Sequence, residues 1–116
     1  MDIDQIKRRL REFAEARDWD QFHSPKNLAS AISVEAAELL ELFQWLSEEK
    51  SRDLDDATKE KVEQEVADVF LYLIRLADKL DIDVMAAATR KIALNAAKYP
   101  VELSKGNARK YTEFKD

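Results

Sequence analysis

Residues 32–46, ISVEAAELLELFQWL, decide the fold of this chain. The stretch is rich in Ala, Leu and Glu, which favour helix, and its apolar residues recur at helical spacing. Three carboxylates, Glu35, Glu38 and Glu41, nevertheless lie inside it. A carboxylate among buried apolar side chains costs free energy unless a partner compensates its charge. The stretch therefore predicts a helix that packs on another helix, and it raises the question of what its acids face.

Similar periodicity recurs along the rest of the chain, and it predicts helices over about residues 2–17, 24–49, 55–80 and 83–98. Capping residues for the last three are Ser24 before Pro25, Asp55 or Asp56, and Asp83. Pro100 limits the final helix, and no strand-like alternation occurs. We therefore expect an all-α fold, an antiparallel four-helix bundle with a C-terminal tail over about residues 99–116.

Composition limits the chemistry. The 116 residues suit a single domain over 1–116, and the absence of cysteine excludes disulfides and thiolate metal sites. Gly106 is the sole glycine, so glycine-rich phosphate loops are excluded. The net charge of −5 argues against nucleic acid as a partner. No apolar run is long enough to span a membrane and no signal peptide is recognisable, so we expect a cytoplasmic protein.

Acids interrupt the apolar rows of two predicted helices. Glu35 stands in the row Leu28, Ile32, Glu35, Leu39, Leu42 and Leu46. Glu65 stands in the row Val62, Glu65, Val69, Tyr72 and Leu76. Glu38 and Asp68 each follow three residues later, which makes them helical neighbours of the row acids. Antiparallel packing would bring both pairs together, whereas a register shifted by one residue would leave these acids in solvent.

Carboxylates gathered in this way need a cation to remain ionised. Zinc prefers His or Cys, and His23 is the only histidine, so hard oxygen ligands favour Mg²⁺, with Mn²⁺ possible. Mg²⁺ usually shares its ligand shell with phosphates. The acids therefore indicate phosphate chemistry.

The pattern Glu35-x-x-Glu38 with Glu65-x-x-Asp68 resembles the signature of the MazG-type all-α nucleoside triphosphate pyrophosphohydrolases. Within that family, the chain resembles most closely the short single-domain branch, which includes the dCTP pyrophosphatases. The stretches that carry the resemblance occur in the same order and span about residues 6–114: RDWDQFHSPKNLA, ELLELFQW, EVADVFLYLI, KYPVE and GNARKYTEF.

The resemblance implies hydrolysis of a nucleoside triphosphate to the monophosphate and pyrophosphate. It implies Glu35, Glu38, Glu65 and Asp68 as metal ligands, and we expect Glu38 to be the general base, although any of the four could serve. It assigns Lys91, Asn95, Lys98 and Tyr99 to the phosphates. Arg109 and Lys110 are further phosphate-binding candidates, and they resemble the family's closing element, which covers a site. The resemblance assigns to the base Trp19, Phe22, His23, Trp45 and Tyr72, and Asn27 is a further candidate because its amide could read a base edge. It also implies a homo-oligomer, either a dimer or a tetramer of paired dimers.

Two features of the sequence depart from the dCTP-hydrolysing members. Leu10 stands where those members have a histidine, so the preferred base and sugar stay open. Ala36 and Ala37 stand between the paired glutamates where those members have a glycine. Two alternatives to the enzyme remain: a helical association module without chemistry, and a nucleotide-binding protein without turnover.

Overall fold

The structure is a computed structural model, and it describes residues 1–114. The last two residues of the predicted tail, 115 and 116, lie outside this range. The described residues form helices and no strand, which confirms the predicted all-α class. The α-helices are α1 (Ile3–Ala16), α2 (Pro25–Glu41), α3 (Glu48–Ser51), α4 (Asp56–Lys79), α5 (Val84–Lys98) and α6 (Val101–Ser104). Two 3-10 helices, η1 (Asp20–Phe22) and η2 (Tyr111–Glu113), complete the set.

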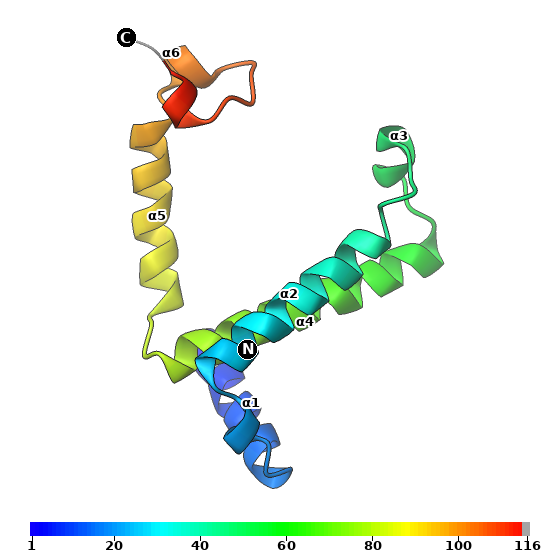
Figure 1. The fold of residues 1–116 in the computed structure, drawn as a ribbon, viewed down its shortest axis with the longest axis vertical. Coiled ribbons are helices and arrows are strands. Elements are labelled where there is room, and N and C mark those ends of the chain that lie inside the picture. The colour runs from blue at the N-terminus through cyan, green and yellow to red at the C-terminus, as the bar shows by residue number, and fades with distance from the viewer. Residues whose placement is uncertain (115–116) are drawn as a thin grey trace. The chain divides into compact units, whose positions relative to one another are not determined.

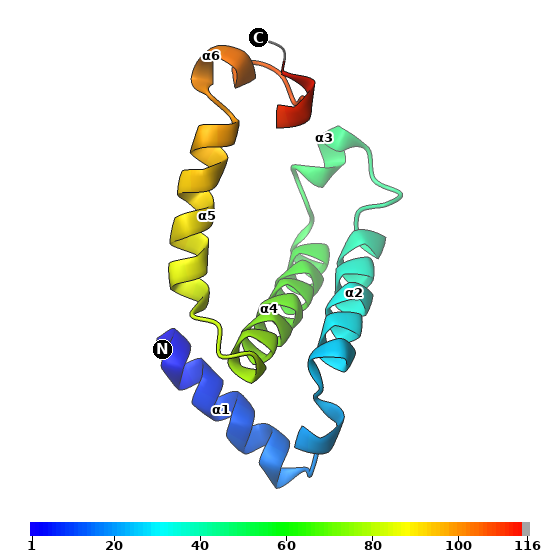
Figure 2. The same ribbon diagram turned by 60° about the vertical axis from the view of Figure 1, so that its left-hand side comes forward.

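The chain forms two compact units, one over Met1–Ile82 and one that begins at Asp83. In the first unit, α2 and α4 run antiparallel and side by side, and α3 lies in the link that joins them (Figures 1 and 2). Helix α1 packs against α4, and η1 packs against α1. The buried apolar side chains are Ala14, Leu28, Ile74 and Ala77. The core of this unit therefore draws on α1, α2 and α4.

The predicted helix starts are confirmed by their caps. The Ser24 hydroxyl accepts a hydrogen bond from the backbone N–H of Asn27, and the Asp55 carboxylate accepts one from Thr58. Asp83 does the same for Ala86 at the start of α5. Each cap satisfies a backbone N–H that has no partner within the helix.

The predicted end of the second helix, at about residue 49, is wrong because α2 ends at Glu41. The Phe43 N–H donates to the Leu40 carbonyl and the Leu46 N–H donates to the Phe43 carbonyl, each three residues back, so turns replace the four-residue bonds of the helix. Ser47 then caps the new helix α3 by accepting a hydrogen bond from the Lys50 N–H. A short separate helix, α3, thus stands where the end of the second helix was predicted.

The second unit contains α5, α6 and η2. The Tyr99 ring meets the rings of Tyr111 and Phe114 edge-on, with centroids 6.1 and 5.8 Å apart. Gly106 has φ of +79°, which only glycine adopts readily, and it lies in the turn that follows α6. None of the helices in residues 1–114 has the length and apolar character that crossing a bilayer requires.

Candidate functional site

Three carboxylates meet between α2 and α4. Glu35 and Glu38 come from α2 and Glu65 comes from α4, and one oxygen of each lies within 4.8 Å of the others. The antiparallel pairing of the two helices brings the acids together, because the acids stand at corresponding places in the two apolar rows. Glu35 and Glu65 are half-buried, whereas Glu38 is exposed. We call these three residues the acid cluster.

The acid cluster has no compensating partner among residues 1–114. Glu35 Oε2 and Glu65 Oε2 are buried, and neither accepts a hydrogen bond from the residues that the structure describes. The pKa of Glu35 is raised from 4.5 to about 7, chiefly by burial and then by the adjacent carboxyl groups of Glu65 and Glu38. Buried oxygen acceptors without donors are suited to a hard divalent cation, which would supply the missing positive charge.

Asp68 lies at the edge of the acid cluster. It follows Glu65 by three residues on α4, and its negative charge contributes to the raised pKa of Glu35. It is exposed and also lines a neighbouring cavity. Asp68 therefore connects the acid cluster with that cavity.

The cavity lies between α1 and α4, and its volume is about 670 Å³. Its walls include three of the residues predicted to hold a base, Trp19, His23 and Tyr72. Leu10 and Phe13 of α1 also line it, and the Phe13 and Trp19 rings meet edge-on at 5.6 Å. Aromatic faces in a mostly apolar cavity provide surfaces on which a flat heterocycle can stack. We call this space the aromatic cavity.

The other predicted base residues do not line the aromatic cavity. Phe22 is 58% exposed in η1. The side-chain amide of Asn27 donates a hydrogen bond of 3.0 Å to the Phe22 carbonyl, which holds η1 to the first turn of α2. Trp45 is 88% exposed in the turn between α2 and α3.

The predicted phosphate residues all lie in the second unit. Lys91 and Asn95 are exposed on α5, and Lys110 is exposed at the start of η2. The other three are gathered around the aromatic rings. The Lys98 ammonium is 4.7 Å from the Tyr111 ring centroid, the Arg109 guanidinium is 5.5 Å from that of Phe114, and Tyr99 contacts both rings.

An ion cluster around the buried Arg75, close to His23, was not predicted. Arg75 is buried in α4, and its guanidinium donates to Asp20 at 2.7 Å and to His23 Nδ1 at 3.3 Å. Asp78 lies 3.8 Å from Arg75 and accepts a hydrogen bond of 2.7 Å from Arg11 on α1. The signal was present in FLYLIRLA, residues 70–77, where Arg75 interrupts an apolar run as Glu35 and Glu65 interrupt theirs.

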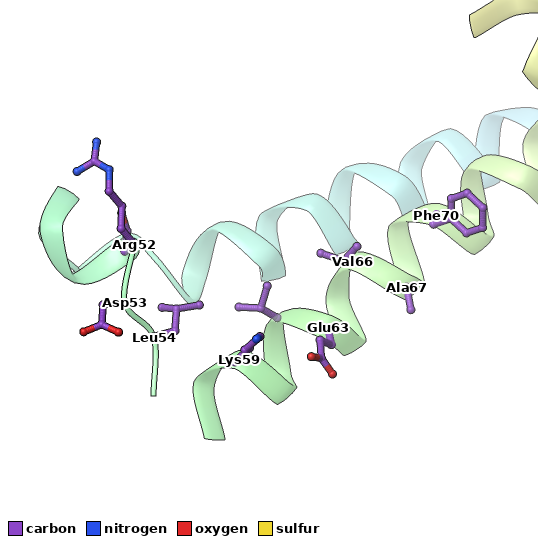
Figure 3. Close-up of a pocket in the computed structure, with 10 residues that line it drawn as sticks. Arg52, Asp53, Leu54, Lys59, Glu63, Val66, Ala67 and Phe70 are labelled. Atoms are coloured by element: carbon purple, nitrogen blue, oxygen red, sulfur yellow. The ribbon is translucent and has the colours of Figure 1, made fainter. Parts of the chain in front are cut away.

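A second cavity, of about 680 Å³, lies along the α3–α4 link and the first half of α4 (Figure 3). Its apolar lining includes Leu54, Val62, Val66 and Phe70. Val66 and Phe70 are 51% and 43% exposed. No residue predicted for catalysis, metal or nucleotide lines this cavity.

Comparisons with known proteins identify the family of this chain. Residues 30–114 match the MazG-like family. The chain is 42% identical to dCTP pyrophosphatase 1 of Rattus norvegicus over 114 residues, which cover 97% of this chain and 67% of that protein. It is 38% identical to dCTP pyrophosphatase 1 of Homo sapiens with the same coverage.

A solved structure is also similar. A pyrophosphatase from Archaeoglobus fulgidus superposes with a TM-score of 0.79 at 44% identity, over 84% of this chain and 91% of that one. These matches confirm the family predicted from the sequence motifs and the helical-bundle fold predicted for the chain. The chain belongs to the MazG-like family.

Proposed function

We propose that the protein hydrolyses a nucleoside triphosphate to the monophosphate and pyrophosphate with a divalent metal ion, in nucleotide-pool housecleaning. The observation that carries the proposal is the acid cluster, whose buried oxygens accept no hydrogen bond from the described residues. Asp68 lies between this cluster and the aromatic cavity. The relatives that are named as pyrophosphatases support the same class of enzyme.

The metal ligands in this proposal are Glu35, Glu38, Glu65 and Asp68, and the ion is Mg²⁺ or, as the alternative, Mn²⁺. The all-oxygen donor set and the two unpartnered oxygens fit such an ion. When bound, the ion would offset negative charge on the phosphates and lower the pKa of a coordinated water.

Glu38 is the proposed general base. It is the exposed member of the acid cluster, so its carboxylate loses less hydration than those of Glu35 and Glu65. A carboxylate oxygen of Glu38 would accept the proton of the attacking water, whose oxygen becomes part of one of the two products. The half-buried acids Glu35 and Glu65 would hold the ion in place.

Trp19, His23 and Tyr72 would hold the base in the aromatic cavity, and Phe22, Asn27 and Trp45 are retained as further proposed base contacts. The proposed phosphate contacts are Lys91, Asn95, Lys98, Tyr99, Arg109 and Lys110. Leu10 lines the cavity and offers no hydrogen bond, so we do not assign cytosine as the preferred base.

We further propose a single functional domain that works in the cytoplasm as a homo-oligomer, a dimer or a tetramer. The apolar lining of the second cavity supports this, because exposed Val and Phe side chains gain free energy when another surface covers them (Figure 3). A monomeric mass in light scattering would contradict it.

Incubation with a panel of canonical and modified nucleotides and Mg²⁺ tests the function. We expect monophosphate and pyrophosphate as products, and no turnover in EDTA. A nucleoside diphosphate with orthophosphate, or turnover that survives EDTA, would contradict the proposal. Binding without hydrolysis would indicate a nucleotide-binding module, and no response to either metal or nucleotide would indicate an association module.

A further inference from the structure

His23 and Arg75 are hydrogen-bonded in the wall of the aromatic cavity. The Arg75 side chain is 6% exposed, and both residues line the cavity with Trp19 and Tyr72. Arg75 Nε donates to His23 Nδ1 at 3.3 Å, and an amino group of the same guanidinium donates to Asp20 Oδ1 at 2.7 Å. A buried arginine thus directs one of its donors at one particular nitrogen of the histidine ring.

This contact determines where the imidazole carries its proton. A guanidinium only donates, so the Nδ1 atom that receives it must offer a lone pair. A neutral imidazole that accepts at Nδ1 has its proton on Nε2. The surroundings also keep the ring neutral, because burial and the positive charges of Arg75 and Lys79 lower the His23 pKa, while the Asp20 charge opposes them.

We propose that Arg75 fixes His23 as the tautomer with its proton on Nε2, so that the cavity presents a hydrogen-bond donor to the nucleobase. The inference rests on the proposed nucleotide chemistry and extends it to base selection. The selected base turns an acceptor toward His23, either a carbonyl oxygen or an unprotonated ring nitrogen, and not an exocyclic amino group. Trp19 and Tyr72 supply the aromatic faces on which the base stacks, and the hydrogen bond from His23 fixes the orientation of the base in the cavity.

Arg75 acts here as a positioning residue. Asp20 lies 2.7 Å from one amino group of the guanidinium and Asp78 lies 3.8 Å from the other, so each amino group has a carboxylate partner. Because the guanidinium is rigid and planar, these partners also set the direction of Nε. Lys79 shares Asp20, so this carboxylate keeps a cationic partner when Arg75 is replaced.

The tautomer can be read directly, because His23 is the only histidine of the chain. In ¹⁵N-labelled protein without nucleotide at pH 7, we expect Nε2 to resonate as a protonated and Nδ1 as an unprotonated nitrogen. Arg75→Met should give a mixture of both tautomers. The control Arg11→Met removes another arginine of the ion cluster, one that pairs with Asp78 and makes no hydrogen bond to His23 in the described residues, and it should leave the pattern unchanged.

A proton on Nδ1 in the unaltered protein would overturn the inference, as would an Arg75→Met spectrum identical to that of the unaltered protein. If Arg75→Met does not fold, Arg75→Lys replaces it, because it keeps a positive charge beside Asp20 and loses the planar guanidinium. The expected result for Arg75→Lys is again a mixture of tautomers.

Base recognition is tested in the same protein with Mg²⁺ and a nucleotide that has a non-hydrolysable α,β-imido group. We expect the Nε2 resonance to shift on binding. His23→Phe should raise KM by about tenfold with a smaller change in kcat, which corresponds to the loss of one hydrogen bond. Arg75→Met should raise KM by a smaller factor than His23→Phe.

The outcomes separate this inference from the proposed function. Hydrolysis with an unchanged KM in His23→Phe, or a static Nε2 resonance on binding, overturns the inference and leaves the proposed function intact. If no nucleotide binds, the proposed function and the base contact both fail, while the tautomer in the unaltered protein still shows whether Arg75 sets the proton position.

Discussion

Helix α4 has two groups of charged residues, and they differ in how their charges are paired. At Glu65, a half-buried carboxylate faces Glu35 and Glu38 with an oxygen that accepts no hydrogen bond from the described residues. At Arg75, by contrast, a buried guanidinium has partners in Asp20 and His23. Paired charges join helices, whereas unpaired buried oxygens identify a place where the folded chain needs a ligand.

The pKa shifts follow the same division. The pKa of Asp78 is lowered, first by its hydrogen bond with Arg11, and that of Asp20 is lowered, first by its hydrogen bond with Lys79. The pKa of Glu35 is instead raised to about 7. Folding therefore favours the charged carboxylate in the ion cluster and the neutral carboxyl in the acid cluster.

The largest expected effect is on turnover. Glu38→Gln removes the proposed general base and a metal ligand, so we expect kcat to fall by about 10²–10⁴-fold with the helical circular dichroism signal retained. Glu60→Gln, an exposed acid on α4, is the matched control and should keep full activity. Retained turnover in Glu38→Gln would remove this residue from the site.

The ion cluster should instead respond in stability. Asp78→Asn removes the charge that pairs with Arg11 and Arg75, and we expect unfolding free energy to fall by up to about 3 kcal/mol. Urea unfolding of the metal-free protein measures this. A midpoint equal to that of the unaltered protein would mean that this cluster does not hold α1 to α4.

A divalent metal should stabilise the acid cluster. At a concentration one hundred times its Kd, Mg²⁺ or Mn²⁺ should raise the unfolding free energy by about 2.7 kcal/mol. Thermal melting with Mg²⁺, Mn²⁺ and EDTA checks this, with Glu65→Gln as the variant that should lose most of the shift. An equal shift in both proteins would place the ion elsewhere.

The smallest effect concerns pH. Because the Glu35 pKa rises from 4.5 unfolded to about 7 folded, its neutral form stabilises the metal-free protein below pH 4.5, and this contribution is lost as pH rises through 7. Glu35→Gln mimics the neutral form. In EDTA, the melting temperature of Glu35→Gln relative to the unaltered protein should therefore increase between pH 5 and 7.5, and a constant difference would contradict the raised pKa.

Most helices could be predicted because their signals are local. The caps Ser24, Asp55 and Asp83 stand directly before the helices they start. The end of α2 could not be predicted in this way, because no glycine or proline, the residues that usually mark the end of a helix, follows it at positions 42–44. The turns that follow Glu41 and the new cap at Ser47 decide it.

The acid cluster could be predicted for a different reason. Glu35 and Glu65 interrupt apolar rows at the same spacing, so one assumption, antiparallel pairing, was enough to bring them together. The ion cluster depends on contacts between residues 52 and 55 positions apart in the chain, Arg75 with His23 and with Asp20. No single helical pattern encodes that pairing, although the charge at Arg75 within an apolar run indicated that a partner was required.

The early end of α2 has a practical consequence for spectroscopy. It leaves Trp45 in a turn with 88% of its surface exposed, while Trp19, the other tryptophan, lines the aromatic cavity. Trp19 is 46% exposed and meets the Phe13 ring, so its emission should be bluer than that of Trp45, which should be redder and more readily quenched by iodide. A ligand confined to the cavity would alter only the bluer component, whereas a second copy or a nucleotide that covers the turn would alter the red one. The chain thus contains two optical reporters, one for cavity entry and one for coverage of the turn.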